Sequence, residues 1–343
     1  MKLTILFGGA SFEHEISIVS AITLKEKLST FELNFIFCDT DHKFYLIDAE
    51  KMKATTFSSG AYKKMAQLHI TNGAFIKKTM FSTVSYNDKV LNLIHGADGE
   101  DGSIAALLEF FSIPFIGPRV DASVFSFDKR YTKSLALARD VKTLSYEILY
   151  KNDKKDITTS YPFIIKPSRL GSSIGVSIVK EKEQLAYALD TAFEFDDCVI
   201  IEPFIAEVKE YNLAGYMANG EIHYSIIEEP QKEEFLDFEK KYMDFSRSKQ
   251  ILEANIDKTL EEKLKEAFYK IYKNLFEGAL IRCDFFVIDN EVYLNEINPI
   301  PGSMANYLFE NFEQVLQDIS LPSKKNITTN YEYIHSISSA KGK

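Results

Sequence analysis

The amino-acid sequence predicts a protein of mixed α/β and α+β class, and three observations support this. At 343 residues and 39.2 kDa the chain is too long for one typical core, so two or three domains are expected. Strand-like and helix-like apolar periodicities alternate along the first third. Hairpin signals follow later, at Asn219-Gly220 and at Asp289-Asn290. We therefore expect an α/β layer followed by smaller α+β units.

The first third predicts an α/β layer with a partly parallel sheet. A strand near 2–7 ends at a Gly-Gly turn, and apolar residues then recur at helical spacing from Ile16 to Leu28. Further strands are expected near 34–39, 43–48, 90–96 and 113–117, with a helix near 103–111.

The rest of the chain predicts two α+β units. A helix over Asp128 to Arg139 precedes strands near 161–167, 175–180 and 198–205, with a helix near 181–193 between the last two. After a hairpin near 212–230 and a polar loop, the capping box Thr259 to Glu262 begins a helix that stops at Gly278. From Ser320 on the sequence has little periodicity.

Composition and charge exclude several classes of protein. Hydrophobic residues at 45% and charged residues at 26% are typical of a soluble globular protein. The net charge of −10 argues against general nucleic-acid or anionic-membrane binding. The odd number of cysteines, Cys38, Cys198 and Cys283, lie in apolar runs and predict reduced thiols. Because no apolar run is long enough for a signal or a membrane span, we expect a cytoplasmic protein.

The strongest chemical signal is a set of polar residues within the apolar, strand-like stretch IRCDFFVIDNEVYLNEIN, 281–298. Side chains alternate faces along a strand, so Arg282 shares a face with Asp284, and Glu296 shares a face with Asn298. A hairpin would bring the four together. Oxygen donors without His or Cys favour Mg²⁺ shared with phosphates over Zn²⁺. The alternative is a surface hairpin with solvated polar faces.

Three glycine-containing motifs indicate further chemistry. The loop at 166–177 begins with Lys166 and could wrap phosphate oxygens with backbone N–H groups, although a plain turn is the commoner outcome. The segment 95–103 follows a buried strand, where open sheets bind ligands, but it also suits a helix N-terminus. In 8–17 the acidic residues open a helix, and the preference of a helix N-terminus for negative charge explains them. The more specific alternative is that Glu15 binds an ammonium group.

Taken in order, EHEIS, HGADGEDG, FDK, IIKPSRLGSS, EYNLAG, IRCDFF and NEINPIPGS resemble the D-alanine:D-alanine ligase family of the ATP-grasp fold. The resemblance covers Leu3 to about Leu308. It implies an N-terminal α/β substrate-binding domain over 1–118, preceding a central ATP-grasp subdomain over 119–208. A C-terminal ATP-grasp subdomain over 209–343 would carry a mobile lid at about 231–257.

The resemblance also implies roles for individual residues. Arg282 and a backbone N–H near Gly302 would face the oxygen that becomes negative during bond formation. Glu15 would position the ammonium of the first D-alanine, and Ser172 and the lid residue Tyr242 would be linked to it. His95 and Glu100 would line the same pocket, with Tyr307 and Leu308 as position-matched contacts to the second substrate. Nucleotide-binding roles fall on Lys129, Lys166, Glu202, Ile205, Glu210 and Lys241, and ligation of two Mg²⁺ or Mn²⁺ ions on Asp284, Glu296 and Asn298.

The reaction implied is ATP-dependent joining of two D-alanine molecules through an acyl phosphate, in a homodimeric enzyme of peptidoglycan synthesis. The sequence differs from many family members at two places. Pro203-Phe204 stands where a contact to the nucleotide base is expected, and Asn306-Tyr307 stands where contacts to the carboxylate of the second substrate are expected. One alternative is a ligase that joins D-alanine to D-lactate, which Tyr242 disfavours. Others are an ATP-grasp ligase for a different acid and amine, and an inactive nucleotide-binding module, which would be expected to lack one of the four residues Arg282, Asp284, Glu296 and Asn298.

Overall fold

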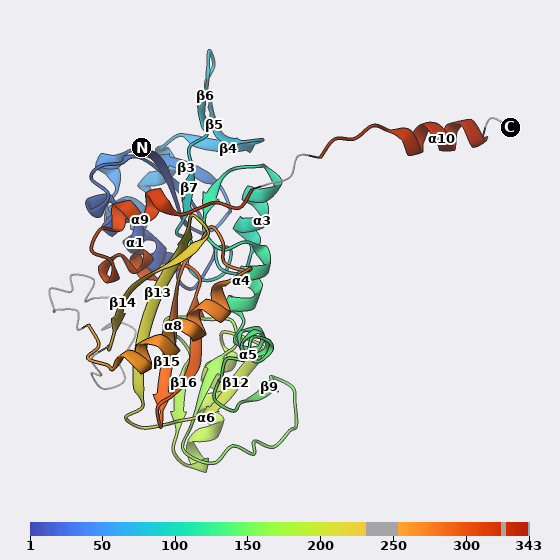
Figure 1. The fold of residues 1–343 in the computed structure, drawn as a ribbon. Helices are drawn as coiled ribbons and strands as arrows, with labels where there is room; N and C mark the ends of the chain where they lie inside the picture. Colours follow the sequence, from blue (N-terminus) through green and yellow to red (C-terminus); the bar gives the residue numbers. More distant parts are fainter. Residues whose placement is uncertain (231–252, 324–326, 342–343) are drawn as a thin grey trace.

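The computed structural model describes residues 1–230, 253–323 and 327–341, and this part of the chain forms three β-sheets with helices packed against them (Figure 1). The sheets follow one another along the sequence. The first has eight strands in the order β6-β5-β4-β3-β2-β1-β7-β8, the second has four in the order β11-β10-β12-β9, and the third has four in the order β14-β13-β15-β16.

The first sheet is the predicted α/β layer. Strand β1 pairs in parallel with β2 and β7, and β7 pairs in parallel with β8, whereas the strands from β2 to β6 pair antiparallel. Both faces of β1 are buried, because Leu3, Ile5 and Phe7 belong to one apolar core and Leu6 to another. The strands are β1 Lys2–Gly8, β2 Glu32–Cys38, β3 Phe44–Ile47, β4 Gln67–Thr71, β5 Ala74–Lys78, β6 Thr83–Tyr86, β7 Val90–Asn92 and β8 Phe115–Ile116.

Helices α1 and α3 accompany this sheet at the places predicted. Helix α1 buries Ile18, Ala21 and Leu24 against one face, and α3 buries Ile104 and Leu108 against the other. Helix α4 follows α3 and packs against both α3 and α5. The helices of this region are α1 His14–Lys27, α2 Ala54–Ser58, α3 Ser103–Phe110, α4 Val120–Phe127 and α5 Lys129–Ala138, with the 3₁₀ helices η1 Ala49–Lys51 and η2 Ala61–Lys64.

The second sheet holds the predicted strands around 161–205, and α6 covers one of its faces. Strand β10 pairs antiparallel with both β11 and β12, so it occupies an inner position. Its alternating burial places Phe163 and Ile165 in a small core and leaves Ile164 and Lys166 on the other face. The elements are β9 Glu147–Tyr150, β10 Phe163–Pro167, β11 Ser177–Val179, η3 Lys182–Gln184, α6 Leu185–Phe193 and β12 Cys198–Pro203.

The third sheet contains both predicted hairpins. Strands β13 and β14 turn at Asn219-Gly220, and β15 and β16 turn at Asp289-Asn290, all four residues having φ between 49° and 85°. Helix α8 packs on this sheet through Leu264, Phe268 and Ile271, among other residues. The elements are β13 Lys209–Ala218, β14 Glu221–Glu228, α8 Lys258–Tyr272, β15 Leu280–Ile288 and β16 Glu291–Asn298.

Helix α8 differs from the prediction at both ends. Its N-cap is Asp257, whose carboxylate accepts a hydrogen bond from the backbone N–H of Leu260 at 2.9 Å, and not Thr259. The helix ends at Tyr272, because Lys273 has ψ 134°, and Gly278 supplies a later positive-φ turn.

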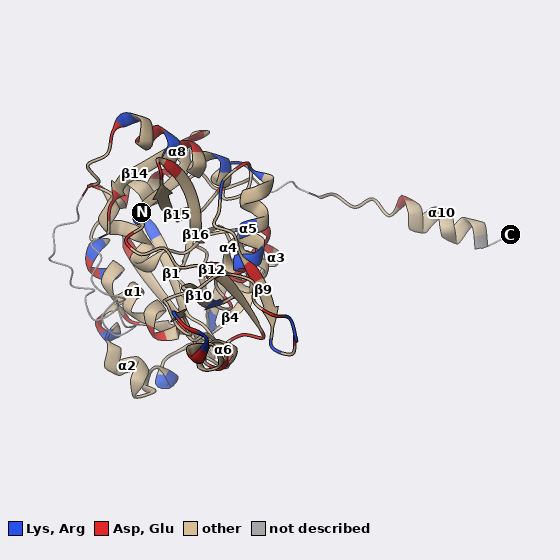
Figure 2. Ribbon diagram, turned by 90° about the horizontal axis from the view of Figure 1, so that it is seen from below, with Lys and Arg blue, Asp and Glu red and all other residues tan. Residues whose placement is uncertain are grey.

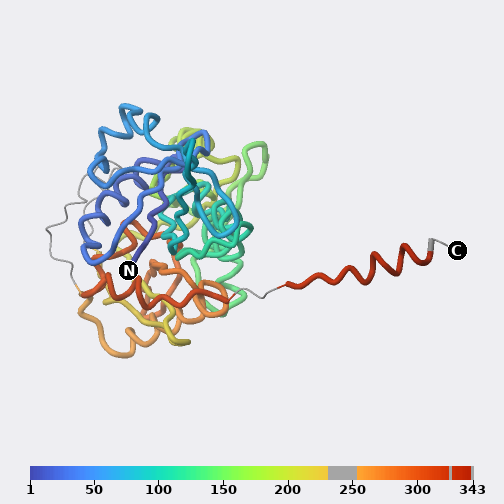
Figure 3. Tube along the Cα trace, turned by 90° about the horizontal axis from the view of Figure 1, so that it is seen from above, coloured from blue at the N-terminus to red at the C-terminus, as the bar shows by residue number. Residues whose placement is uncertain are grey.

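The C-terminal segment first packs against the N-terminal layer and then leaves the body. The 3₁₀ segment η4, Gly302–Leu308, contains three successive left-handed residues, Ser303 to Ala305, and buries Met304 and Leu308 in the core of the first sheet. Helix α9, Phe312–Asp318, follows. Helix α10, Glu332–Lys341, stands off the body in Figures 1 and 3, although the sequence after Ser320 predicted no helix.

Acidic and basic side chains are interspersed over the body in Figure 2. Among the helices that the structure describes, none combines the length and the apolar character that crossing a bilayer requires.

Candidate active site

The hairpin of β15 and β16 brings together the four polar residues predicted from the sequence. Across it Arg282 is the register partner of Asn298, and Asp284 is the partner of Glu296. The guanidinium of Arg282 donates two hydrogen bonds to Asp284, from Nε at 2.6 Å and from Nη2 at 2.7 Å. The amide of Asn298 donates to the same carboxylate at 3.1 Å. The alternation of the two strands therefore builds a fixed, largely buried platform.

Charge on the platform is balanced only in part. Burial opposes the charge of Arg282, but Asp284 outweighs it and raises the pKa of the guanidinium. Burial raises the pKa of Asp284 to about 7, with Arg282 opposing the shift and the nearby carboxylates of Glu296 and Glu210 adding to it. A cation placed between carboxylates crowded in this way would offset their mutual repulsion and favour their charged forms.

The donor set fits a magnesium ion that also uses substrate oxygens. Within the described residues no group of three His, Cys, Asp or Glu side chains is arranged to hold a metal ion by itself. The platform supplies two carboxylates, Asp284 and Glu296, and the amide of Asn298, all oxygen donors. Mg²⁺ is usually bound by one or two carboxylates completed by phosphate and water oxygens. An isolated Asp–Glu–Asn set therefore suits a metal that arrives with a polyphosphate.

A buried carboxylate lies between two lysines next to this platform. Glu202, at the end of β12, pairs with Lys166 of β10 at 2.8 Å and with Lys133 of α5 through its other oxygen. Lys166 Nζ also contacts the Asn295 side chain at 3.3 Å, where β16 shifts register. Burial opposes the charge of Glu202, but the two ammonium groups lower its pKa to about 2.

The lysines differ in their electrostatics. Burial would lower the pKa of Lys166, but Glu202 and Glu296 outweigh it and raise that pKa. Burial lowers the pKa of Lys129, and the Lys166 charge adds to this, while Glu296 opposes it. Lys129 Nζ donates to the carbonyl oxygen of Leu170 at 2.6 Å, which places it under the glycine-containing loop after β10. Lys129 and Lys166 thus form a positive pair beside the Glu296 carboxylate.

A second cluster joins the N-terminal layer to that loop. The Ser172 hydroxyl donates a hydrogen bond to Oε1 of Glu13, which is 5% exposed and immediately precedes α1. Burial, with the Glu100 charge adding to it, raises the pKa of Glu13. Two glycines make room for this carboxylate. A Cβ at Gly171 would lie 3.0 Å from Oε1, and one at Gly96 would lie 2.8 Å from Oε2.

Oε2 of Glu13 is buried and accepts no hydrogen bond from any described residue. Buried carboxylate oxygens are normally paired, because leaving one unpaired costs free energy. The orphan oxygen therefore fits a donor supplied by a ligand, and an ammonium group is the donor that complements a carboxylate best.

His95 and Glu100 lie against this cluster, as predicted. Their Nδ1 and Oε1 atoms are 3.5 Å apart, and His95 Nε2 is 3.1 Å from the Ser20 hydroxyl, which also accepts a hydrogen bond from Ser303 N. Burial lowers the pKa of His95 to about 4 and raises the pKa of Glu100 to about 8. Near pH 7 this pair is therefore mostly uncharged.

Of the residues near 302–308, some border the site and others pack in the core. No described atom lies within 4 Å of a Cβ built at Gly302, so its backbone borders open space. The Tyr307 hydroxyl accepts a hydrogen bond from Arg282 Nη1 at 3.3 Å and so reaches the platform. Leu308 is 1% exposed and packs in the core of the first sheet. The side chain of Leu308 is therefore used for packing, and the predicted contact of this position to the second substrate stays a prediction.

The structure places a carboxylate other than the predicted Glu15 in this cluster. Glu15 lies on an exposed side of the first turn of α1, whereas Glu13, two residues earlier, occupies the buried place beside Ser172. Two residues on a helix are about 200° apart, so both carboxylates cannot face the same cluster. Lys241 and Tyr242 lie outside the described residues. Glu210 lies on β13, close enough for its charge to act on Lys166 and Asp284, and Ile205 follows β12.

Lys133 was missed in the sequence. It is 2% exposed and pairs with Glu202, yet it lies in a helix with no motif around it. The available signal was its spacing, because Lys133 lies four residues after Lys129 and therefore on the same helix face.

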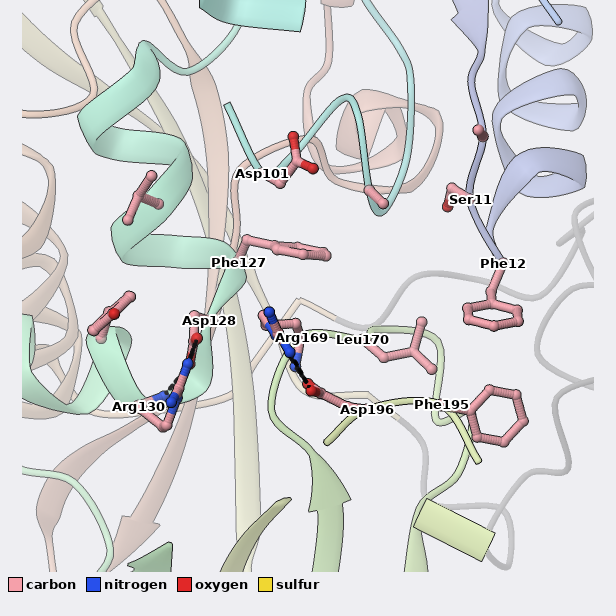
Figure 4. A pocket seen from close by; sticks show the side chains of 14 residues that line it. Ser11, Phe12, Asp101, Phe127, Asp128, Arg130, Arg169, Leu170, Phe195 and Asp196 are labelled. Carbon is pink, nitrogen blue, oxygen red and sulfur yellow. Dashed lines mark hydrogen bonds and ion pairs between the residues drawn. The ribbon is translucent and has the colours of Figure 1, made fainter. Parts of the chain in front are cut away.

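A cavity of about 640 Å³ is lined in part by Arg169 and Leu170, and none of the predicted site residues lines it (Figure 4). Its walls include two ion pairs, Arg130 with Asp128 and Arg169 with Asp196. Asp196 also accepts a hydrogen bond from the backbone N–H of Arg169 at 2.8 Å. Of the two pairs, the one between Arg169 and Asp196 holds the start of the loop that carries Ser172.

Comparison with known proteins agrees with this geometry. A family model described as "D-ala D-ala ligase N-terminus" matches residues 2–118, and one described as "D-ala D-ala ligase C-terminus" matches 135–314. The chain is 68% identical over 345 residues to the D-alanine–D-alanine ligase of Sulfurimonas denitrificans, and 56% identical over 346 residues to that of Wolinella succinogenes. Both alignments cover 100% of each chain.

Solved structures show the same likeness. A crystal structure of a D-alanine–D-alanine ligase from Helicobacter pylori has a TM-score of 0.85 and 48% identity, covering 95% of this chain and 100% of that one. The VanG D-Ala:D-Ser ligase from Enterococcus faecalis has a TM-score of 0.75 and 25% identity, covering 93% of this chain and 98% of that one.

Proposed function

The chain belongs to the D-alanine–D-alanine ligase family, and from this premise we propose that it joins two D-alanine molecules to D-alanyl-D-alanine at the expense of ATP. The predicted ATP-grasp fold with an N-terminal α/β domain is confirmed by these likenesses. Within the site, one observation supports the proposal above the others. It is the buried Oε2 of Glu13, which accepts no hydrogen bond from a described residue and suits the ammonium of an amino acid.

In the first step, the carboxylate of the first D-alanine attacks the γ-phosphorus of ATP. A new P–O bond forms, the bond to the β-phosphate oxygen breaks, and ADP leaves with that electron pair. Lys129 and Lys166 are placed to bind the phosphate oxygens, since both ammonium groups lie close enough for the Glu296 charge to act on them. Glu13, held by Ser172, binds the ammonium and so aims the carboxylate.

In the second step, the amine of the second D-alanine attacks the carbonyl carbon of the acyl phosphate. A C–N bond forms, the amine loses a proton, and the C–O bond to phosphate breaks to release inorganic phosphate. Arg282 is the group that neutralises the carbonyl oxygen as it becomes negative. Its guanidinium is already oriented by Asp284 and Tyr307, so no reorganisation is required when the charge develops.

Asp284, Glu296 and Asn298 would hold two Mg²⁺ or Mn²⁺ ions together with the ATP phosphates. When bound, the ions supply neutralisation of phosphate charge and orientation of the transferred group. The raised pKa of Asp284 supports this assignment, because a carboxylate that is crowded by others is one that a cation would keep ionised.

The predicted pathway, cellular location, oligomeric state and lid of the enzyme form part of the same proposal. A ligase of this kind would serve peptidoglycan precursor synthesis in the cytoplasm, where ATP and D-alanine are available, and would act as a homodimer. The stretch 231–257 would close over the site as a lid and exclude water, which would otherwise hydrolyse the acyl phosphate. The domain boundaries at 118 and 208 remain predictions.

Phosphate release from ATP and Mg²⁺ tests the proposal when it is measured with D-alanine, with L-alanine, and with D-alanine plus D-lactate. We expect release with D-alanine alone, and a product with the mass of D-alanyl-D-alanine. If phosphate release required D-lactate, the protein would instead be a ligase that joins D-alanine to D-lactate. No release with any of the three would contradict the proposed substrate class.

A further inference from the structure

A row of polar side chains crosses the third sheet beside the platform. Asn212 of β13 is the register partner of Asp284 on one side and of Glu228, on the edge strand β14, on the other. Asp284 is in turn the partner of Glu296, so the row spans all four strands (Figure 1). Cross-strand partners share one face of a sheet. Asn212 and Glu228, neither of which the sequence predicted for the site, therefore continue the platform toward β14.

Asn212 and Glu228 lie on the face of the sheet that is turned away from α8. Their sequence neighbours Leu213 and Ile227 pair with each other and pack in the core that α8 covers. Because side chains alternate along a strand, Asn212 and Glu228 share the opposite face with the platform residue Asp284. Both are buried there, Asn212 being 7% exposed and Glu228 4% exposed. Two polar side chains are thus held away from water beside the platform.

The Asn212 side chain is paired at its nitrogen only. Its Nδ2 donates a hydrogen bond to Oε2 of Glu228 at 3.0 Å, and a carboxylate accepts hydrogen bonds, which fixes the orientation of the amide. Oδ1 is buried and accepts no hydrogen bond from any described residue. A buried acceptor without a donor costs free energy, so such an atom beside a site fits a donor that a ligand supplies. Because Glu228 adds negative charge next to it, the matching ligand carries N–H groups and a positive charge.

Tyr307 connects this pair to the guanidinium that acts in the second step. Segment η4 packs against both β14 and β15, and its Tyr307 hydroxyl accepts a hydrogen bond from Arg282 at 3.3 Å. Burial raises the pKa of Tyr307, Arg282 opposes this, and the negative charges of Glu228 and Asp284 add to it. Glu228 therefore lies close to the hydroxyl that Arg282 contacts. In the proposed second step the attacking nitrogen starts about 3 Å from the carbonyl carbon whose oxygen Arg282 neutralises, so it lies in the same region.

We propose that Glu228 and Asn212 bind the amino group of the second D-alanine. An ammonium offers three N–H donors and one positive charge, and the pair offers a carboxylate and a buried amide oxygen to receive them. The guanidinium of Arg282 repels an incoming ammonium, and the Glu228 charge offsets that repulsion. D-Lactate carries a hydroxyl in place of the ammonium and gains less from a carboxylate, so the pair also selects an amine over a hydroxyl. The proposal rests on the proposed function, because it names residues for one of its two amino-acid substrates.

Trapping of the acyl phosphate tests the proposal, because it separates the two substrates. Hydroxylamine is neutral and displaces phosphate from the acyl phosphate to give the hydroxamate of D-alanine, so hydroxamate formation reports the first step without a second D-alanine. At D-alanine concentrations that saturate hydroxamate formation, Glu228→Gln should lower kcat/KM for the second D-alanine by about 10- to 100-fold, and hydroxamate formation itself by less than about twofold. Asn212→Leu should show the same division with a smaller loss. Equal losses in the two assays, or unchanged dipeptide formation, would overturn the proposal.

Competition between D-alanine and D-lactate for the second place gives an independent readout. Glu228→Gln should raise the ratio of D-alanyl-D-lactate to D-alanyl-D-alanine by about tenfold, measured by mass. Glu228→Asp keeps the charge and should recover part of the selection. A role in packing alone would leave the ratio unchanged, and that result would count against the assignment.

Glu229→Gln is the matched control. Glu229 is the next residue, and its charge acts on Tyr211, which packs in the core on the α8 side of the sheet. This variant should change neither the rates nor the product ratio, and thermal unfolding checks that each variant is folded. A wild-type chain that releases no phosphate with D-alanine would contradict the proposed function itself. An active wild-type chain from which Glu228→Gln is indistinguishable would contradict this assignment alone.

Discussion

The hydroxyl of Ser172 donates a hydrogen bond to the carboxylate of Glu13, which lies 159 residues earlier in the sequence. The bond ties the loop after β10 to the first turn of α1, and so it joins two parts of the chain that come from different sheets. It also fixes one oxygen of Glu13 and leaves the other buried and open to a ligand.

Replacing Glu13 by Gln should lower kcat/KM for D-alanine by about 10- to 100-fold, because one charge-assisted hydrogen bond to the ammonium is lost. Glu15→Gln is the matched control, two residues away on an exposed side of α1, and should change kcat/KM by less than about twofold. Steady-state kinetics with D-alanine varied at saturating ATP measures both. The reverse ranking of the two variants would return the ammonium contact to Glu15.

Glu296→Gln should reduce turnover by about 1000-fold while leaving the fold intact, because the substitution removes one charge from the set that would hold the metal ions. Initial rates at increasing Mg²⁺ measure the loss, and circular dichroism checks the fold. Chelation of divalent ions should stop the wild-type reaction without altering the melting temperature of the ligand-free protein. Near-normal rates in the variant would contradict the ligand assignment.

Lys133→Met should destabilise the protein by about 3 kcal/mol, because a buried carboxylate loses one of its two cations. It should also raise KM for ATP more than it lowers kcat, since Lys166 would be drawn toward Glu202 and away from the phosphates. Denaturant unfolding and ATP kinetics measure the two effects. Lys133→Arg, which restores the charge, should recover part of both, and no recovery would indicate a packing role only.

The buried carboxylate of Glu202 predicts that the protein loses stability in acid. Its pKa in the folded protein, about 2, lies below its ordinary value of 4.5, so its stabilising contribution is fully present above pH 4.5 and is lost as the pH falls toward 2. The contribution is about 3 kcal/mol for a shift of this size. Glu202→Gln should therefore flatten the decline of unfolding free energy between pH 4.5 and 2. An unchanged acid profile would contradict the double pairing.

Glu100 predicts the opposite behaviour at higher pH. Burial raises its pKa from 4.5 to about 8, so the folded state holds a proton that the unfolded chain has lost, and stability declines as the pH rises through this interval. Glu100→Gln should raise the unfolding free energy by about 4 kcal/mol at pH 8.5 and leave it nearly unchanged at pH 4. Thermal unfolding across this range measures it, and an equal effect at both pH values would exclude titration as the cause.

Much of the fold followed from local patterns. The hairpin at Asp289-Asn290 and the alternation of β15 and β16 are encoded within 18 residues, so the sequence placed Arg282 beside Asp284 correctly. Short strands such as β6, Thr83–Tyr86, were missed, because their side chains are mostly exposed and carry no apolar alternation. Helix α10 was missed for a related reason. Its apolar stripe contacts no core and is only four residues long.

The site was less predictable than the fold, because it depends on contacts between distant segments. Glu13 and Glu15 both suit the dipole of α1, and only the packing of the loop around Ser172 distinguishes them. Lys133 resembles a solvated helix residue in the sequence, and its burial arises from Glu202, 69 positions later. Local propensity carries no information about such pairs.

The platform on β15 and β16 comes late in the chain, and this has a consequence during synthesis. Glu13 leaves the ribosome early, whereas Arg282, Asp284 and Glu296 are added in the last fifth of translation. A nascent or prematurely terminated chain therefore lacks the residues to which we assign the metal ions and the developing oxyanion, even when its N-terminal layer has formed. Under the proposed mechanism, such incomplete copies would not turn over ATP.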